Sequence, residues 1–187
     1  MKPRPTASSD VVLEIQANLI TDALDIEFKD SPPYPKSRAE TAADLIVVLS
    51  RNQDGFIRMT DLKKKGWAAN ERVAGFLSNK TPFAQRALSQ AVRTWVMEEG
   101  VRFPVAEGQR CAFNLGTRRM TGEVLGVIAL EATGLVEGKG ASSTDTPTRY
   151  RVNAEDVTQH LKGNGIVLVK PVREQVGFEL LPGAVAS

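Results

Sequence analysis

The sequence predicts an α+β protein, with a helical N-terminal half followed by a half built from antiparallel strands. Between residues 9 and 100, apolar residues recur at spacings of three and four, which is the period of an amphipathic helix. From Val101 onward they alternate with polar residues, which is the period of a strand. Runs rich in proline or glycine separate the segments. The change of period predicts two domains within 187 residues, with a boundary between Gly100 and Gly108.

The clearest helix lies between Thr81 and Gly100. Thr81 can cap its first turn, and Pro82 occupies the first helical position, where a missing N–H costs nothing. Gly100 can adopt the left-handed conformation that ends a helix. One apolar stripe follows the helical period: Phe83, Ala87, Leu88, Ala91, Val92 and Trp95. We interpret this segment as the last helix of a helical domain.

The N-terminal region predicts a tail, a helix and a linker. Residues 1–8 are polar and proline-rich, so we expect disorder there. Residues 9–28 predict an amphipathic helix whose polar face is acidic, and the proline-rich residues 29–36 predict an extended linker. The helix either packs on the body of the protein or, since a linker follows it, docks on a protein partner.

Residues 37–100 predict a domain of four helices. Ser37 and Glu40 form a capping box, and Asn70 can cap a later helix. Between them, Phe56 to Met59 predicts a short extended piece, followed by a helix capped by Thr60. This order, with its hydrophobic extended piece, resembles a winged-helix or helix-turn-helix domain. A small helical protein-interaction domain fits nearly as well.

Residues 101–187 predict short strands and turns. Expected strands cover 101–105, 109–115, 120–130, 149–153 and 166–169, and Val176, Phe178 and Leu180 predict a last strand or a docking tail. Gly122 and Gly126 suit a bulge or a sharp bend. The Gly/Ser/Thr-rich residues 132–147 predict a long mobile loop, and Ala154 to Leu161 a helical turn.

Three short stretches carry a resemblance within this second half: Gly108-Gln-Arg-Cys-Ala-Phe113, Gly122-Glu-Val124 and Tyr150-Arg-Val152. Together with the glycine-bent strand and the helical turn before the fourth strand, they resemble an SH3-like barrel of the Tudor or KOW kind. The resemblance implies a small antiparallel β-barrel as the C-terminal domain.

The sequence offers few groups for catalysis or for metal binding. His160 and Cys111 are the single residues of their types, which excludes a Cys/His zinc site within one chain. We expect Cys111 to be a core side chain and His160 a surface or packing residue. Ser50 to Asp61 follows a calcium-loop template in part, with Asn52 and Asp54 at ligand positions. Ser50 replaces the first aspartate, so we expect no metal. Because carboxylates alone would have to carry any catalytic chemistry, we also expect no cofactor and no enzymatic activity.

Basic residues in both halves suggest a nucleic-acid partner. Residues 36–100 contain eleven basic and seven acidic side chains, a net charge of +4 in a chain whose total is +2. The candidate nucleic-acid-binding residues are Lys63, Lys64, Lys65, Arg72, Lys80, Arg86, Arg118, Arg119, Arg149 and Arg151, with Arg93 and Arg110 as basic neighbours. The competing interpretation for each cluster is a solvated surface, and we expect Lys63 to Lys65 to be exposed.

The sequence thus predicts a non-enzymatic nucleic-acid-binding or accessory protein. The alternative is a protein-protein adaptor that assembles complexes through helix 9–28 and the barrel. No window approaches 18 uncharged apolar residues, and no apolar segment precedes Asp10, so we expect neither a membrane span nor a secretory signal. A single cysteine agrees with a reducing, cytoplasmic setting.

Overall fold

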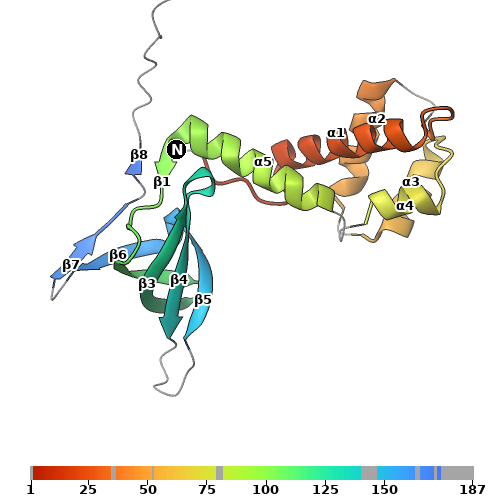
Figure 1. The fold of residues 1–187 in the computed structure, drawn as a ribbon. Coiled ribbons are helices and arrows are strands. Elements are labelled where there is room, and N and C mark those ends of the chain that lie inside the picture. The colour runs from red at the N-terminus through yellow and green to blue at the C-terminus, as the bar shows by residue number, and fades with distance from the viewer. Residues whose placement is uncertain are drawn as a thin grey trace, which may run out of the picture. The chain divides into compact units, whose positions relative to one another are not determined.

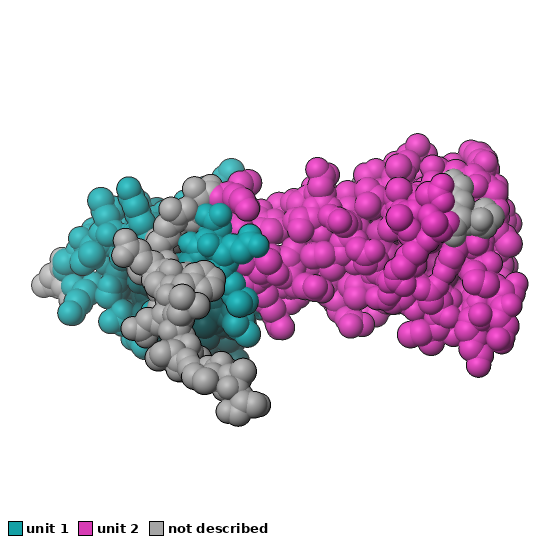
Figure 2. Space-filling view, turned by 90° about the horizontal axis from the view of Figure 1, so that it is seen from above, with its two compact units in different colours: residues 1, 96–187 teal, residues 2–95 magenta. Residues whose placement is uncertain are grey.

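The computed structural model describes residues 2–34, 37–51, 53–78, 82–139, 147–162, 165–170 and 172–173. Its contacts divide the chain into a helical unit, residues 2–95, and a sheet unit that begins at Val96. Figure 1 shows helices in the first unit and strands in the second, and Figure 2 colours the two units separately. The α+β fold class is therefore correct. The division falls inside the last helix, before the expected boundary.

The helical unit contains five helices in its described residues: α1 (Asp10–Glu27), α2 (Arg38–Leu49), α3 (Gly55–Lys64), α4 (Glu71–Phe76) and α5 (Pro82–Glu99). Side-chain caps fix three of the starts. The Ser37 hydroxyl accepts from the Glu40 N–H in the expected capping box, and Asn70 caps α4 by accepting from the Val73 N–H. Gly100 ends α5 with φ of 59°, the predicted left-handed conformation.

The core of the helical unit joins α1 to the three helices that follow it. It contains Leu13, Ala17, Ile20, Leu24, Leu45, Val48, Leu49, Leu62, Trp67, Ala69, Val73 and Leu77. A smaller cluster packs Val12 of α1 against Ala87 and Ala91 of α5. The apolar stripe of α1 is thus buried within its own unit. A partner bound to α1 would have to contact its remaining surface, which carries acidic side chains together with exposed Val11 and Ile26.

The start of α3 differs from the expectation. Phe56 to Met59 is helical rather than extended, because the Asp54 carboxylate caps the helix by accepting from the Phe56 and Ile57 N–H groups at 2.9 Å. Thr60 therefore lies inside the helix, where its hydroxyl donates to the Phe56 carbonyl. The prediction that Thr60 caps this helix is therefore wrong, since Asp54, six residues earlier, forms the cap.

Residues 2–8 contact α5, although disorder was expected for residues 1–8. The Trp95 indole N–H donates to the Lys2 carbonyl at 3.0 Å, and the Arg4 guanidinium lies 5.4 Å from the centre of the Trp95 ring. The Thr6 N–H donates to the Ser9 hydroxyl just before α1. One buried tryptophan thus supplies both a hydrogen-bond donor and an aromatic face to this segment, which composition alone did not indicate.

The sheet unit is built from antiparallel strands: β1 (Val101–Arg102), β2 (Arg110–Leu115), β3 (Arg118–Ile128), β4 (Thr133–Lys139), β5 (Thr148–Asn153), β6 (Val157–Lys162), β7 (Gly165–Leu168) and β8 (Val172–Arg173). Six of them form one sheet in the order β5-β4-β3-β2-β6-β7, and β1 pairs with β8. Short 3₁₀ turns cover Ala129–Glu131 and Ala154–Asp156. Its buried residues include Val101, Phe103, Val105, Cys111, Ala112, Phe113, Met120, Val124, Val136, Val152 and Val157.

The expected mobile loop at 132–147 is wrong for residues 133–139, which form β4. Its glycines suggested a loop, but they are sites of close packing. A Cβ on Gly134 would overlap the Phe103 ring, and one on Gly138 would lie 2.9 Å from the Thr121 carbonyl oxygen. These glycines therefore allow neighbouring groups to pack closely against the strand, and they do not indicate a flexible loop. Residues 140–146 of the expected loop lie outside the described residues.

Two further expectations concern the strands. The bulge expected around Gly122 and Gly126 is present, because the β3–β4 register shifts between Val124 and Gly126. The helical turn expected from Ala154 to Leu161 stops at Asp156 and gives way to β6, so His160 lies on a strand. Pairing with both β2 and β7 stabilises residues 157–162 as a strand, a long-range effect that local sequence does not reveal.

Candidate functional site

The three consecutive lysines have different environments. Lys63 is exposed at the end of α3. Lys64 pairs with Asp61, one helical turn earlier, at 3.0 Å, and Lys65 pairs with Asp44 of α2 at 2.7 Å. Asp44 is buried and also accepts from the Trp67 indole N–H at 3.1 Å. The prediction that all three lysines are exposed is therefore wrong for Lys65, whose charge compensates a buried carboxylate.

Most other basic candidates in the helical unit are either paired or isolated. Arg72 of α4 pairs with Glu27 of α1 at 2.9 Å, which ties these two helices together. Arg86 and Arg93 are exposed and lie two turns apart on α5, and the described residues include no carboxylate within ion-pair distance of either one. Lys80 lies outside the described residues. The helical unit therefore does not gather its predicted basic residues into one patch of unpaired charge.

The basic candidates of the sheet unit show the same pattern. Arg149 and Arg151 alternate with Tyr150 and Val152 on β5, which covers the strand expected at 149–153. Arg149 lies 3.5 Å from Glu137 on the neighbouring strand β4, and Arg151 pairs with Glu131.

The hairpin between β2 and β3 holds the remaining two candidates. Arg119 donates to the side-chain oxygen of Gln159 on β6. Arg118 and the neighbouring candidate Arg110 are exposed. Within the described residues neither Arg118 nor Arg110 has a carboxylate or amide partner, whereas Arg119, Arg149 and Arg151 each have one.

The buried position of Arg58 was not predicted from the sequence. Arg58 of α3 is only 2% exposed, and its guanidinium donates to the carbonyls of Leu77 at 2.7 Å, Arg51 at 2.8 Å and Leu49 at 3.3 Å. Burial lowers the pKa of this guanidinium from its usual value. These carbonyls belong to the ends of α2 and α4, where a helix lacks its own donors. Arg58 thus supplies hydrogen-bond donors to the C-terminal ends of α2 and α4. In the sequence, the apolar residues beside Arg58 were the only indication that its side chain is buried.

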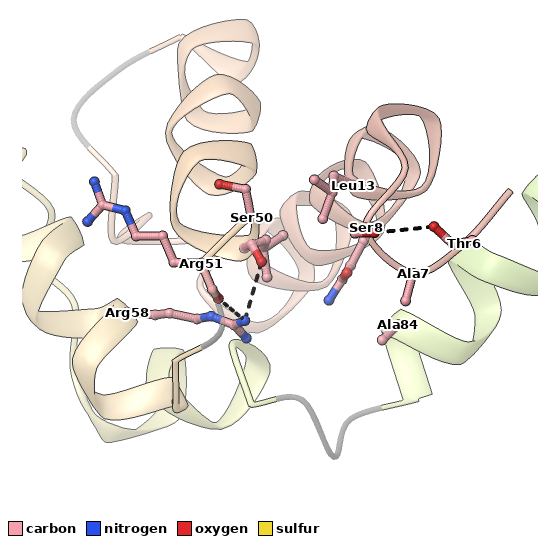
Figure 3. Close-up of a pocket in the computed structure, with 10 residues that line it drawn as sticks. Thr6, Ala7, Ser8, Leu13, Ser50, Arg51, Arg58 and Ala84 are labelled. Carbon is pink, nitrogen blue, oxygen red and sulfur yellow. Dashed lines mark hydrogen bonds between the residues drawn. The ribbon is translucent and has the colours of Figure 1, made fainter.

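A hollow of about 510 Å³ opens beside Arg58 in the helical unit. Figure 3 shows Arg58 reaching toward Arg51 and the end of α2, with Thr6, Ala7 and Ser8 on the opposite side. Its remaining walls include Leu13 and Ala84. The Arg58 donors are directed at backbone carbonyls, and the other polar residues of the lining are Thr6, Ser8, Gln16, Ser50 and Arg51. This arrangement defines no chemical class of ligand.

The partial calcium-loop pattern is not assembled as a metal site in the described residues. The Asp54 carboxylate caps α3, and the Asp61 carboxylate pairs with Arg51 at 2.7 Å as well as with Lys64. These contacts, with the hydrogen bond from Lys64 as the largest cause, lower the pKa of Asp61. The third candidate ligand, Asn52, lies outside the described residues. The carboxylates of Asp54 and Asp61 therefore stabilise the fold, one as a helix cap and the other in ion pairs.

Cys111 and His160 are brought together, which their separation in sequence did not suggest. They face each other as partners in the β2–β6 register. Cys111 is fully buried, however, and burial raises the pKa of its thiol to about 11. A thiol with that pKa is almost entirely protonated near neutral pH, and the thiolate is the nucleophile. The pair therefore lacks the activated sulfur that a Cys-His catalytic site requires.

The most unusual surface of the sheet unit is its edge strand β7. Ile166, Val167 and Leu168 are 64%, 48% and 79% exposed. On its inner side β7 pairs with β6, and no described strand pairs with its outer side. Figure 1 shows β7 at the end of the sheet opposite β5. Soluble proteins usually protect such edges with charge, proline or a covering element.

The remaining evidence on function is negative. Comparison of the chain with protein-family models, with curated proteins and with solved structures found no significant match in any of the three. Within the described residues, no helix is both long enough and apolar enough to cross a bilayer. The assignment of a function therefore depends on the geometry of the described residues.

Proposed function

We propose that this chain is a non-enzymatic adaptor whose sheet unit binds an extended segment of another protein along β7. The observation that carries the proposal is the exposure of Ile166, Val167 and Leu168 on a strand whose outer side pairs with no described strand. The free N–H and C=O groups of such an edge can hydrogen-bond to an added strand. Of the two functions expected from the sequence, this geometry favours the adaptor.

The chemistry of the edge specifies its partner. Ile166 and Leu168 are two residues apart and lie on one face of the strand, while Val167 lies on the other. Exposed Lys162 and Lys170 flank the strand. A complementary segment is therefore extended, alternates apolar residues, and has acidic residues at its ends. Main-chain hydrogen bonds would give affinity, and the alternating side chains would give specificity.

A peptide-binding experiment tests this proposal. We expect a selection from a library of extended peptides on the full chain to enrich the alternating, acid-flanked pattern. The double variant Ile166→Lys/Leu168→Lys should weaken binding of the enriched peptides by roughly tenfold or more, a loss of at least ~1.4 kcal/mol. Val47→Lys, at an exposed position of α2, is the matched control and should bind as wild type does. Enriched peptides that bind the double variant unchanged would contradict the proposal.

The finer fold of the sheet unit belongs to the same proposal. We propose that it is an SH3-like barrel elaborated by the β6–β7 hairpin. The antiparallel strand order supports this, as do the register shifts in the β2–β6 and β3–β4 pairs, which bend strands. The buried thiol of Cys111 is compatible with a reducing, cytoplasmic setting, which we also propose.

Nucleic-acid binding remains the second candidate, and one specific observation favours it. Exposed Lys63, Arg86, Arg93 and Arg118 have no carboxylate partner within the described part of the chain. With a winged-helix-like role for residues 37–100, α5 would present two arginines to phosphates. Each phosphate contact should contribute about 0.9 to the slope of log affinity against log salt.

The charge variants distinguish this second candidate from nonspecific attraction. Lys63→Gln/Arg86→Gln/Arg93→Gln should lower affinity for DNA or RNA and flatten the salt slope in fluorescence-anisotropy titrations. The control Lys64→Gln/Arg72→Gln/Arg149→Gln also removes three positive charges, all of which are already paired inside the chain. Equal losses in both variants would show that net charge alone is responsible. No binding at low salt in the wild type would exclude this candidate.

A further inference from the structure

The hollow beside Arg58 in the helical unit has a floor of buried side chains. Leu13 and Gln16 of α1 and Leu49 of α2 all line it, and each is at most 6% exposed. Residues 6–8, which lie on the side opposite Arg58 in Figure 3, are exposed and form part of its rim. A volume of about 510 Å³ falls within the range of roughly 300–1,000 Å³ that is usual for small-molecule sites. The hollow is therefore large enough to admit a small molecule.

Gln16 differs from the other buried polar residues of the described helical unit, which are Thr21, Thr41, Asp44 and Arg58. Each of the two threonine hydroxyls donates to the backbone carbonyl one turn earlier, at 2.9 Å. Asp44 and Arg58 have the hydrogen bonds described above. Within the residues that the structure describes, the side-chain amide of Gln16 has no such partner. Its hydrogen-bonding capacity is therefore available to a group inside the hollow.

The list of lining residues defines no class of ligand, but a side-chain amide that is only 5% exposed narrows the choice. The Gln16 amide carries two N–H donors and a carbonyl acceptor on one planar group. Because unpaired polar groups in a buried place cost free energy, a ligand that pairs with both gains more there than on an open surface. Another amide is the matching group, since its carbonyl accepts from Gln16 while its N–H donates to the Gln16 carbonyl. A bound amide would replace the water that otherwise serves this side chain.

The charges around the hollow favour an uncharged ligand. Its described lining includes Arg51 and Arg58 but no acidic residue, which disfavours a cation. The Arg58 guanidinium donates to backbone carbonyls rather than toward a bound anion. Figure 3 shows the Arg51 side chain extending away from the hollow, and its guanidinium pairs with Asp61. Leu13 and Leu49 are left to contact the apolar part of a ligand.

We infer that this hollow binds a small uncharged molecule in which an amide lies next to a branched apolar group, and that Gln16 selects the amide. The amide hydrogen-bonds to Gln16, and the apolar group packs on Leu13 and Leu49. The hollow lies in the helical unit, whereas β7 lies in the sheet unit. The inference therefore does not depend on the proposed binding of a peptide at β7, and each can fail while the other holds.

A matched series of small probes tests the inference on the full chain. Isovaleramide, isovalerate and isoamylamine share one branched apolar group and differ in carrying an amide, a carboxylate or an ammonium group. In proton–nitrogen correlation spectra, isovaleramide should shift the side-chain NH₂ signals of Gln16. Its affinity should exceed that of both charged probes by roughly tenfold. Acetamide, which lacks the branched group, should bind more weakly than isovaleramide.

Two variants separate the role of Gln16 from that of the shape of the hollow. Gln16→Leu keeps a side chain of similar size at a buried position, so the chain should fold, but affinity for isovaleramide should fall roughly tenfold. Its preference for isovaleramide over isovalerate should also be lost. Ala84→Met retains Gln16 and narrows the hollow, so it should weaken binding of isovaleramide as well. Asn18→Leu, at an exposed position of α1 outside the described lining, is the matched control and should bind as wild type does.

Three outcomes would overturn the inference. Unchanged binding of isovaleramide to Gln16→Leu would show that Gln16 does not select the amide. Equal affinity of the wild type for the three probes would show an apolar crevice without selectivity. Isovaleramide that leaves the Gln16 side-chain signals unshifted would show that it does not reach the floor of the hollow. Circular dichroism and thermal unfolding establish that each variant is folded.

Discussion

At the scale of single residues, Asp44 explains why a run of three lysines is not a uniform basic patch. Its two carboxylate oxygens accept from Lys65 and from the Trp67 indole. A buried carboxylate without such partners would be strongly destabilising, so Lys65 is required where it lies. Three consecutive residues spread around a helix, because each is rotated about 100° from the one before. The position of α2 decides which of the three lysines pairs with the buried carboxylate of Asp44.

The Asp44 pair gives the first prediction. Lys65→Gln should lower the free energy of unfolding by about 1–2 kcal/mol, less than a fully buried pair because Lys65 is 35% exposed. Lys63→Gln, at an exposed position, should change it by less than ~0.5 kcal/mol. Urea denaturation followed by tryptophan fluorescence measures both. Equal stability of the two variants would show that Asp44 does not need the Lys65 charge.

Cys111 gives the second prediction, which concerns pH. Its thiol pKa is raised to about 11 from an ordinary value of 9.0. At a pH below both pKa values, raising the pKa by one unit lowers the thiolate fraction about tenfold. The native thiol should therefore react with iodoacetamide at pH 8 about 100-fold more slowly than the thiol of the denatured chain. The raised pKa stabilises the fold fully below pH 9, and this contribution should be lost as pH rises toward 11. Rapid native labelling would contradict this environment.

At the scale of elements, glycine positions fix how neighbouring segments approach. Gly55 follows Asp54, which caps α3. Gly55 serves close packing instead of an unusual turn conformation, because a Cβ there would overlap the Ala74 carbonyl oxygen. Gly134 has the same role toward Phe103. In both cases the tertiary fold decides which neighbour lies against the glycine. The composition around Gly134 therefore suggested a loop, because its neighbour Phe103 is distant in sequence.

The α3–α4 contact gives the third prediction. Gly55→Ala should destabilise the helical unit by about 1–3 kcal/mol, because the added methyl group overpacks a site closed by backbone atoms. Gly75→Ala, within α4, is the matched control. Nothing lies within 4 Å of a Cβ at Gly75, so alanine should stabilise the helix by up to ~1 kcal/mol. Thermal unfolding measures the two shifts. Stabilisation by both substitutions would refute the close approach.

At the scale of the whole molecule, the chain consists of two compact units with separate cores. Both tryptophans lie in the helical unit, whereas Phe113 is fully buried in the sheet unit. A reporter in one unit can therefore be combined with a mutation in the other. This arrangement makes the independence of the two units measurable.

The fourth prediction follows from this arrangement. Phe113→Ala should destabilise the sheet unit by about 3–5 kcal/mol, as is usual for removing a buried ring. The unfolding transition reported by Trp67 and Trp95 should move by less than ~0.5 kcal/mol if the two compact units are energetically independent. Hydrogen exchange of the strands and tryptophan fluorescence follow the two units separately. A parallel shift in both signals would show that the units unfold together.

The sequence by itself determined the class of the fold and most element boundaries. Local signals carried that information: the capping box at Ser37, the Asn70 cap, Gly100 at the end of α5, and the change of hydrophobic period that follows it. These signals depend on residues within one or two turns of each other, so they can be recognised from the sequence alone.

The tertiary structure alone decided the roles of the charged, glycine and edge residues. Lys65, Arg149 and Arg151 became ion-pair partners, and Arg58 became a buried donor to helix ends, because of segments distant in sequence. β4 and β6 became strands through pairing across the sheet. The exposure of β7 likewise depends on which strand lies at the end of the order. Pairing, burial and charge compensation are long-range properties, and local residue patterns do not encode them.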